Sequence, residues 1–123
     1  LPPIIVIKRK QVMLQMDTKD YSFVGDNHLE HLYQVFEKLK LNPNLTQNGA
    51  ISYLCSLDDH PEKIEQLALE SSSVFDVSVT KGLLLLTIRH YNKEVLSKFI
   101  KETDSVLLTQ QTPETIQVLM QDL

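Results

Sequence analysis

Hydrophobic and polar residues alternate with a period of two in several short segments of the chain. Val12, Leu14 and Met16 alternate with Gln11, Met13 and Gln15, which predicts a strand with one buried face. A β-branched run at residues 4–7, bounded by two prolines and by Lys8-Arg9-Lys10, predicts a separate strand before it. Similar runs predict further strands over residues 44–47, 51–57, 75–79, 83–88, 106–108 and 115–120.

Three segments show the spacing of helices that bury one face. The first is expected to be capped by Asp26 or Asn27, with Glu30 at the reciprocal position, and its predicted buried face consists of Leu29, Leu32, Tyr33, Phe36 and Leu39. The second begins at Pro61 and has a shorter apolar stripe, made of Ile64, Leu67 and Ala68. The third is expected to run from its cap Asn92 to Lys101.

The order of these elements contains strand-helix-strand-strand twice, which indicates an internal duplication of architecture. Helices that bury one face, between strands of this kind, predict the α+β class: two ferredoxin-like βαββαβ modules with antiparallel sheets and helices on one face. The second module ends without its last helix and strand, and residues 4–7 can supply that strand. We therefore expect a first module at 10–80, nested in a discontinuous second module of 1–9 plus 81–123.

Composition and charge exclude several classes of protein. Of the 123 residues, 42% are hydrophobic and 23% are charged, as in an ordinary globular protein. The net charge of −4 and the absence of a basic run argue against a nucleic-acid partner. The longest apolar run, at 83–88, is too short to cross a membrane. A single cysteine and no signal-peptide pattern at Leu1-Pro2-Pro3 lead us to expect a cytoplasmic fragment of a longer protein.

Residues able to perform catalysis or to bind a metal are not grouped in the sequence. The only glycines are Gly25, Gly49 and Gly82, so no phosphate-binding loop is present. His28 and His31 lie one helical turn apart, but an isolated pair is expected to be solvated surface, and we predict no metal site. The alternation around Cys55 places it on an apolar strand face, where it is expected to be a packed thiol. We assign no catalytic residue and no cofactor to this chain.

The segment from Leu29 through Leu57 resembles the first ACT module of aspartokinases, the family that phosphorylates aspartate. In that family a helix of the pattern F-L-x-x-V-F-x-x-F leads to V-D-L-I-T-T-S-E-x-S-V-S, and the matching stretch here runs from Asn44 to Ser52 without a gap. Residues 79–88 resemble the strand that opens the second module, and residues 107–120 resemble its closing pair of strands. The stretch 17–24 is similar to a loop of one branch of the family.

This resemblance implies a role in regulation. The family's kinase domain, which uses ATP and Mg, lies N-terminal to these modules and is absent here; its reaction is the first step towards lysine, threonine and methionine. The ACT modules of the family pair in a homodimer, and an end-product amino acid binds between a loop of one copy and a strand of its partner. Carried over by position, the effector-binding candidates are Asp20, Ser22 and Phe23 in the loop, and Asn44, Gln47 and Asn48 on the strand.

The identity of the effector stays open at this point. Lysine-sensitive members of the family have an Asp where this chain has Asn44, whereas Gln47 matches the glutamine of threonine-sensitive relatives. Lysine, threonine and a pocket that binds nothing are therefore three alternatives, the last being a purely structural dimerisation module. A small independent enzyme and a scaffold that pairs strand to strand are two further alternatives, and the sequence argues against the enzyme because it lacks a catalytic cluster.

Overall fold

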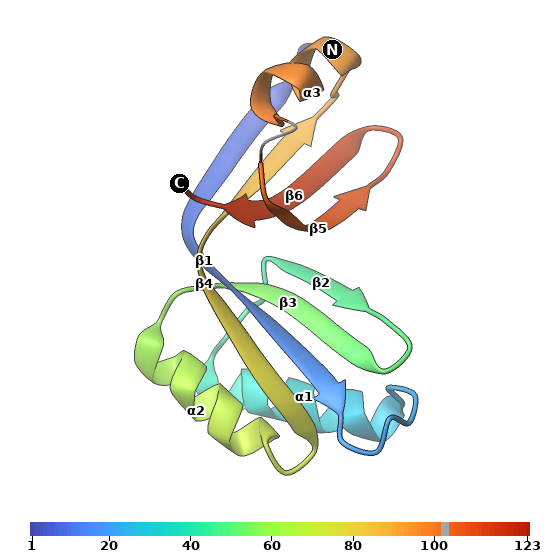
Figure 1. Ribbon diagram of the computed structural model, residues 1–123, viewed down its shortest axis with the longest axis vertical. Coiled ribbons are helices and arrows are strands. Elements are labelled where there is room, and N and C mark those ends of the chain that lie inside the picture. The colour runs from blue at the N-terminus through green and yellow to red at the C-terminus, as the bar shows by residue number, and fades with distance from the viewer. Residues whose placement is uncertain (102–103) are drawn as a thin grey trace. The chain divides into compact units, whose positions relative to one another are not determined.

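A computed structural model describes residues 1–101 and 104–123, which form six strands and three helices (Figure 1). The elements in chain order are β1 (Ile4–Thr18), α1 (Asp26–Leu39), β2 (Leu45–Asn48), β3 (Ser52–Asp58), α2 (Pro61–Ser71), β4 (Phe75–Arg89), α3 (Lys93–Phe99), β5 (Val106–Gln111) and β6 (Thr115–Gln121). The strands are hydrogen bonded in the order β2-β3-β1-β4-β6-β5, and the pairs β2/β3, β4/β6 and β5/β6 are antiparallel. The predicted α+β class with a ferredoxin-like arrangement is consistent with this architecture.

The chain divides into two compact units. The first, here called the central unit, is the continuous stretch Val12–Lys81. The second, here called the terminal unit, combines Leu1–Gln11 with Gly82–Leu123. The division falls within β1 and within β4, so each of these two strands contributes to both units. No helix of the described residues is long and apolar enough to cross a membrane.

The core of the central unit lies between one face of its strands and the helices α1 and α2. Alternation along the strands places Leu14, Cys55 and Phe75 on this face, and helical spacing brings Leu32 and Leu67 against them. All five side chains are almost fully buried. In Figure 1, α1 and α2 lie side by side below these strands, and the ion pair between Lys38 and Glu70 joins the two helices.

In the terminal unit, α3 packs against one face of the strands and covers a hydrophobic core. This core is formed by alternate residues of β4 and β6, among them Ile88 and Val118, with Leu96 and Phe99 of α3 packed against them. Asn92 caps α3 as predicted, since its side-chain oxygen accepts a hydrogen bond from the backbone N–H of Val95 at 2.8 Å.

In two places the sequence predicts a pair of separate strands, and the structure has one continuous strand instead. Residues 4–7 and 12–16 belong to the single strand β1, and residues 75–79 and 83–88 belong to the single strand β4. Lys10 and Gly82 have positive φ angles of 54° and 72°, so the backbone turns locally at both residues while the strand continues. Glycine adopts such an angle without steric cost, which explains its place in β4.

The start and the buried face of α1 also differ from the prediction. The helix begins one or two residues earlier than expected, with Gly25 at the N-cap in place of Asp26 or Asn27. The Gly25 N–H donates to Nδ1 of His28 at 3.0 Å. The predicted capping by Asp26 or Asn27 with Glu30 is therefore wrong. Tyr33, expected in the core, is 53% exposed.

Candidate functional site

The loop between β1 and α1, residues 19–25, is held at both ends by the turn of the β2–β3 hairpin. The backbone N–H of Thr18 donates to the carbonyl of Ile51 at 2.9 Å, and that of Val24 donates to the carbonyl of Ala50 at 2.8 Å. Inside the loop, Oγ1 of Thr18 donates to the carbonyl of Ser22 at 2.6 Å. The loop therefore has a defined conformation next to the end of β2.

Asp20 and Ser22 form a local hydrogen-bonded turn within this loop. The carboxylate of Asp20 accepts from Oγ of Ser22 at 2.6 Å and from its backbone N–H at 3.1 Å. These bonds, the side-chain bond first, hold the pKa of Asp20 below its usual value because they favour the charged form. The loop thus presents a carboxylate that is ionised at neutral pH.

Two aromatic side chains of the same loop lie open to solvent. Phe23 is 77% exposed and Tyr21 is 79% exposed, and Tyr21 has a positive φ of 58°. A large apolar side chain in solvent gains nothing from the fold, so these two rings are available to contact a ligand or a second protein chain.

Two of the three strand candidates, Gln47 and Asn48, lie on β2, which is the first strand in the sheet order and has β3 as its neighbour there. Gln47 lies opposite Leu54, and Asn48 lies opposite Tyr53. Because side chains alternate along a strand, Asn48 shares the helix-covered face with Tyr53 and Gln47 lies on the other face. Both side chains are exposed.

Asn44 precedes β2 and lies at the opposite end of this strand from the loop. Its backbone N–H donates to the carbonyl of Ser56 at 2.8 Å, and its side-chain amide donates to Oδ1 of Asp58 at 2.9 Å. The distance from Asn44 to Asn48 along an extended strand is roughly 13 Å. The structure therefore brings the loop candidates together near Asn48 and keeps Asn44 apart from them.

Replacing Asn44 by Asp tests the role of this amide. The new carboxylate cannot donate to Asp58 and repels it, so we expect Asn44→Asp to lower the unfolding free energy by about 1–2 kcal/mol at neutral pH. Urea unfolding followed by circular dichroism measures the change. The loss of stability should be smaller in acid, where one of the two carboxyl groups becomes protonated. Equal stability of the variant and the original chain at neutral pH would contradict the contact between Asn44 and Asp58.

The partners that hold the loop have no signature in the sequence. The carbonyls of Ala50 and Ile51 are backbone atoms, and a backbone acceptor leaves no pattern in residue type. Thr18 carries a weak signal, because threonine hydroxyls often bond nearby backbone groups in turns. His28 and His31 make structural bonds: Nδ1 of His28 accepts from Gly25, and Nε2 of His31 lies 3.0 Å from the carbonyl of Glu70.

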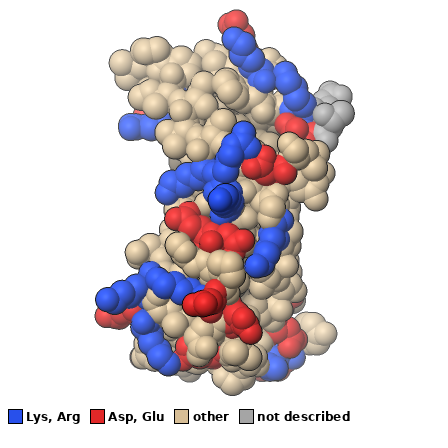
Figure 2. All heavy atoms as spheres, turned by 90° about the vertical axis from the view of Figure 1, so that its left-hand side faces the viewer, with Lys and Arg blue, Asp and Glu red and all other residues tan. Residues whose placement is uncertain are grey.

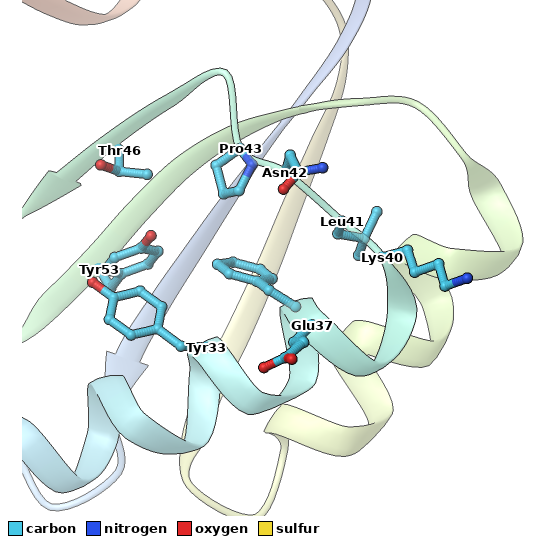
Figure 3. Close-up of a pocket in the computed structure, with 9 residues that line it drawn as sticks. Tyr33, Glu37, Lys40, Leu41, Asn42, Pro43, Thr46 and Tyr53 are labelled. Carbon is cyan, nitrogen blue, oxygen red and sulfur yellow. The ribbon is translucent and has the colours of Figure 1, made fainter.

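A separate hollow of about 510 Å³ opens between the C-terminal half of α1 and the β2–β3 hairpin (Figure 3). It is lined by the aromatic residues Tyr33, Phe36 and Tyr53, by the charged residues Glu37 and Lys40, and by Leu41, Asn42, Pro43 and Thr46. Burial raises the pKa of Tyr53 above that of an ordinary tyrosine, so this phenol is neutral at physiological pH.

The described residues contain no group of three or more His, Cys, Asp or Glu side chains placed to hold a metal ion. On the face shown in Figure 2, Lys and Arg side chains are interspersed with Asp and Glu.

No protein-family model matches the sequence, and no curated protein is similar to it in sequence. Solved structures are similar in fold, and the class that they define is the regulatory domain of aspartate kinases. This class agrees with the resemblance found in the sequence. Sequence identities to these structures are low, so the likeness concerns the fold.

Three structures represent this class. The chain matches a C-terminal regulatory domain of aspartate kinase from Porphyromonas gingivalis W83 at 13% identity, with a TM-score of 0.82 over 98% of this chain and 87% of that one. It matches Escherichia coli aspartokinase III in complex with lysine and aspartate at 16% identity, with a TM-score of 0.75 over 96% and 29%. It matches the regulatory subunit of aspartate kinase from Thermus thermophilus at 7% identity, with a TM-score of 0.69 over 96% and 87%.

Proposed function

We propose that this chain is the regulatory region of an aspartokinase. The observation that carries the proposal is the likeness of fold to an aspartate kinase regulatory domain along 98% of the chain. The chain spans only 29% of the length of the E. coli aspartokinase that it resembles. The proposal places the phosphorylation of aspartate, with its ATP and Mg, in a kinase domain outside the matching region, and it assigns no catalytic residue to this chain.

The proposal includes two ACT modules, one nested within the other. The central unit contains its own βαββαβ order, from the second half of β1 to the first half of β4. The terminal unit begins with the second half of β4 and continues through α3, β5 and β6, and the first half of β1 completes its sheet. The two units support boundaries close to 10–80 for the first module and 1–9 plus 81–123 for the second.

The proposed effector site lies where the 19–25 loop of one copy meets β2 of a second copy. The ionised Asp20 suits the ammonium group of an amino acid, and the exposed ring of Phe23 suits its apolar carbons. The amides of Gln47 and Asn48 on the edge strand are donors for a carboxylate. Lysine, which is bound in the E. coli aspartokinase III complex, and threonine are the two effectors to test.

A structural dimerisation module without an effector is the second candidate. The observation that favours it is the hydrogen bond between Asn44 and Asp58, because this candidate amide is already engaged within its own copy. Edge strand β2 remains able to pair with a second copy in either case.

Thermal unfolding with added amino acids separates the two candidates. At a concentration of ~100 times Kd, a ligand adds about 2.7 kcal/mol to stability, so the matching amino acid should raise Tm by roughly 5 °C or more. The increase should be lost in Asp20→Asn and Gln47→Ala. It should persist in Glu65→Gln, which removes a charge from the exposed side of α2. No shift with lysine, threonine or methionine would favour the structural module.

Sedimentation of the chain tests the dimer that both candidates require. We expect a concentration-dependent dimer, because β2 exposes an unpaired edge. A strict monomer at high concentration would count against an effector site between copies and against a dimerisation module alike.

A further inference from the structure

The hollow beside α1 is a feature that the proposed effector site does not use. Its volume of about 510 Å³ lies in the range of pockets that hold small molecules. Its lining consists of residues 33, 36, 37, 40–43, 46 and 53. None of these residues belongs to the 19–25 loop or is one of the effector-binding candidates on β2.

Aromatic side chains form one end of this hollow. Tyr33 and Phe36 come from α1 and Tyr53 comes from β3, and the rings of Phe36 and Tyr53 pack with their centroids 6.4 Å apart. Figure 3 shows Tyr33 beside Tyr53, with Pro43 and Thr46 above them. The half-exposed ring of Tyr33 offers its π-system to a bound group, and such a face attracts cations.

Negative charge lies next to these rings. Within the described part of the chain, no hydrogen bond or ion pair engages the carboxylate of Glu37, whereas the adjacent Lys38 pairs with Glu70. Lys40 also lines the hollow, but Figure 3 shows its side chain directed away from the two tyrosines. The C-terminal end of α1, at Leu39, adds the negative pole of the helix dipole at the same place.

We propose that this hollow binds a small organic cation, a primary ammonium group on a short aliphatic stem. The ammonium contacts the face of Tyr33 and the carboxylate of Glu37, and the stem lies against Pro43 and the aromatic end of the hollow. An anion is disfavoured by Glu37 and by the helix terminus, and a neutral ligand gains no charge–charge attraction to Glu37. This site is separate from the proposed effector site and holds whether or not that proposal is correct.

Titration of the isotope-labelled chain with n-butylammonium chloride, followed by NMR, tests the site. We expect saturable shifts of the backbone signals of residues 33–43 and 53, with Kd in the millimolar range. Butan-1-ol has the same stem without the charge and should bind several-fold more weakly. Sodium chloride at the same ionic strength corrects for screening.

Variants of this chain distinguish the contacts. Tyr33→Ala and Glu37→Gln should each raise Kd by about 2–5-fold, the size expected for an exposed cation–π contact or surface ion pair. Tyr33→Phe keeps the ring and should bind like the original chain, and Glu65→Gln is the matched charge control. Equal binding of butan-1-ol, unchanged affinity in Glu37→Gln, or no shifts at all would overturn the proposal. If only the proposed effector site is absent, n-butylammonium should still shift the signals of residues 33–43 and 53. Amino acids should then leave the signals of residues 19–25 unchanged.

Discussion

Replacing Phe75 by alanine is expected to destabilise the chain by about 3–5 kcal/mol, because the substitution leaves a cavity in the core of the central unit. Phe75 is 1% exposed, packs in the core between the strands and the helices α1 and α2, and has the ring of His28 at a centroid distance of 5.7 Å. Urea unfolding followed by circular dichroism gives the free energy. A loss of this size is a large part of the stability of an ordinary small domain.

Phe23→Ala is the matched control for this prediction. The chemical change is the same, but the ring of Phe23 is 77% exposed, so the stability should change by no more than about 0.5 kcal/mol. Equal losses in the two variants would mean that Phe75 is not in the core of the protein in solution.

The second large effect is a loss of stability in alkali that originates at Cys55. Burial raises the pKa of this thiol from 9.0 to about 12. Above about pH 9 the unfolded chain releases the proton while the folded chain keeps it, so the unfolded state binds fewer protons and stability falls as pH rises. The expected slope is roughly 1.4 kcal/mol per pH unit between the two pKa values, and stability below the unfolded pKa is unaffected.

Cys55→Ala isolates this contribution because alanine has no proton to release. Urea unfolding of both chains at several pH values from ~8 to ~10 should show a shallower decline in the variant, whatever its stability at the lowest pH. Burial raises the pKa of Tyr53 as well, so the decline in stability that Tyr53 causes in alkali remains in the variant. Parallel declines in the two chains would show that the thiol titrates normally and is not enclosed.

The helices and short strands were predictable because periodicity reports which face of an element is buried. For example, the spacing of Ile64 and Leu67 predicts that both face the core, and the structure shows them buried in α2. The cap of α3 was predictable from residue type, and the structure confirms that Asn92 is the cap. The long strands were not predictable in the same way. Charged residues at 8–10 and the Lys81-Gly82 pair are typical of breaks, yet both lie inside strands, where lysine and arginine remain in solvent and glycine accepts the local turn.

Less of the site than of the fold could be predicted. The resemblance places Asp20 and Ser22 together in one loop, and the structure shows them hydrogen bonded. It also places Asn44 on the strand of the partner copy, and no local pattern could reveal that the side-chain amide of Asn44 donates a hydrogen bond to Asp58 within its own copy. The helical spacing predicts Tyr33 in the core, and this prediction is wrong. Spacing within a helix does not show where the sheet that covers the helix ends.

The division of β1 between two units affects how the chain folds as it is synthesised. The central unit is continuous, so all of its strands have been made once Lys81 has emerged. The terminal unit uses residues 1–11, which are made before the central unit, but its other strands come only after the whole of Val12–Lys81. Contacts so distant along the chain form slowly. The apolar residues 4–7 therefore have no other strand of their own unit to pair with until residues beyond Lys81 have been made. We expect this unpaired interval to favour aggregation of the nascent chain.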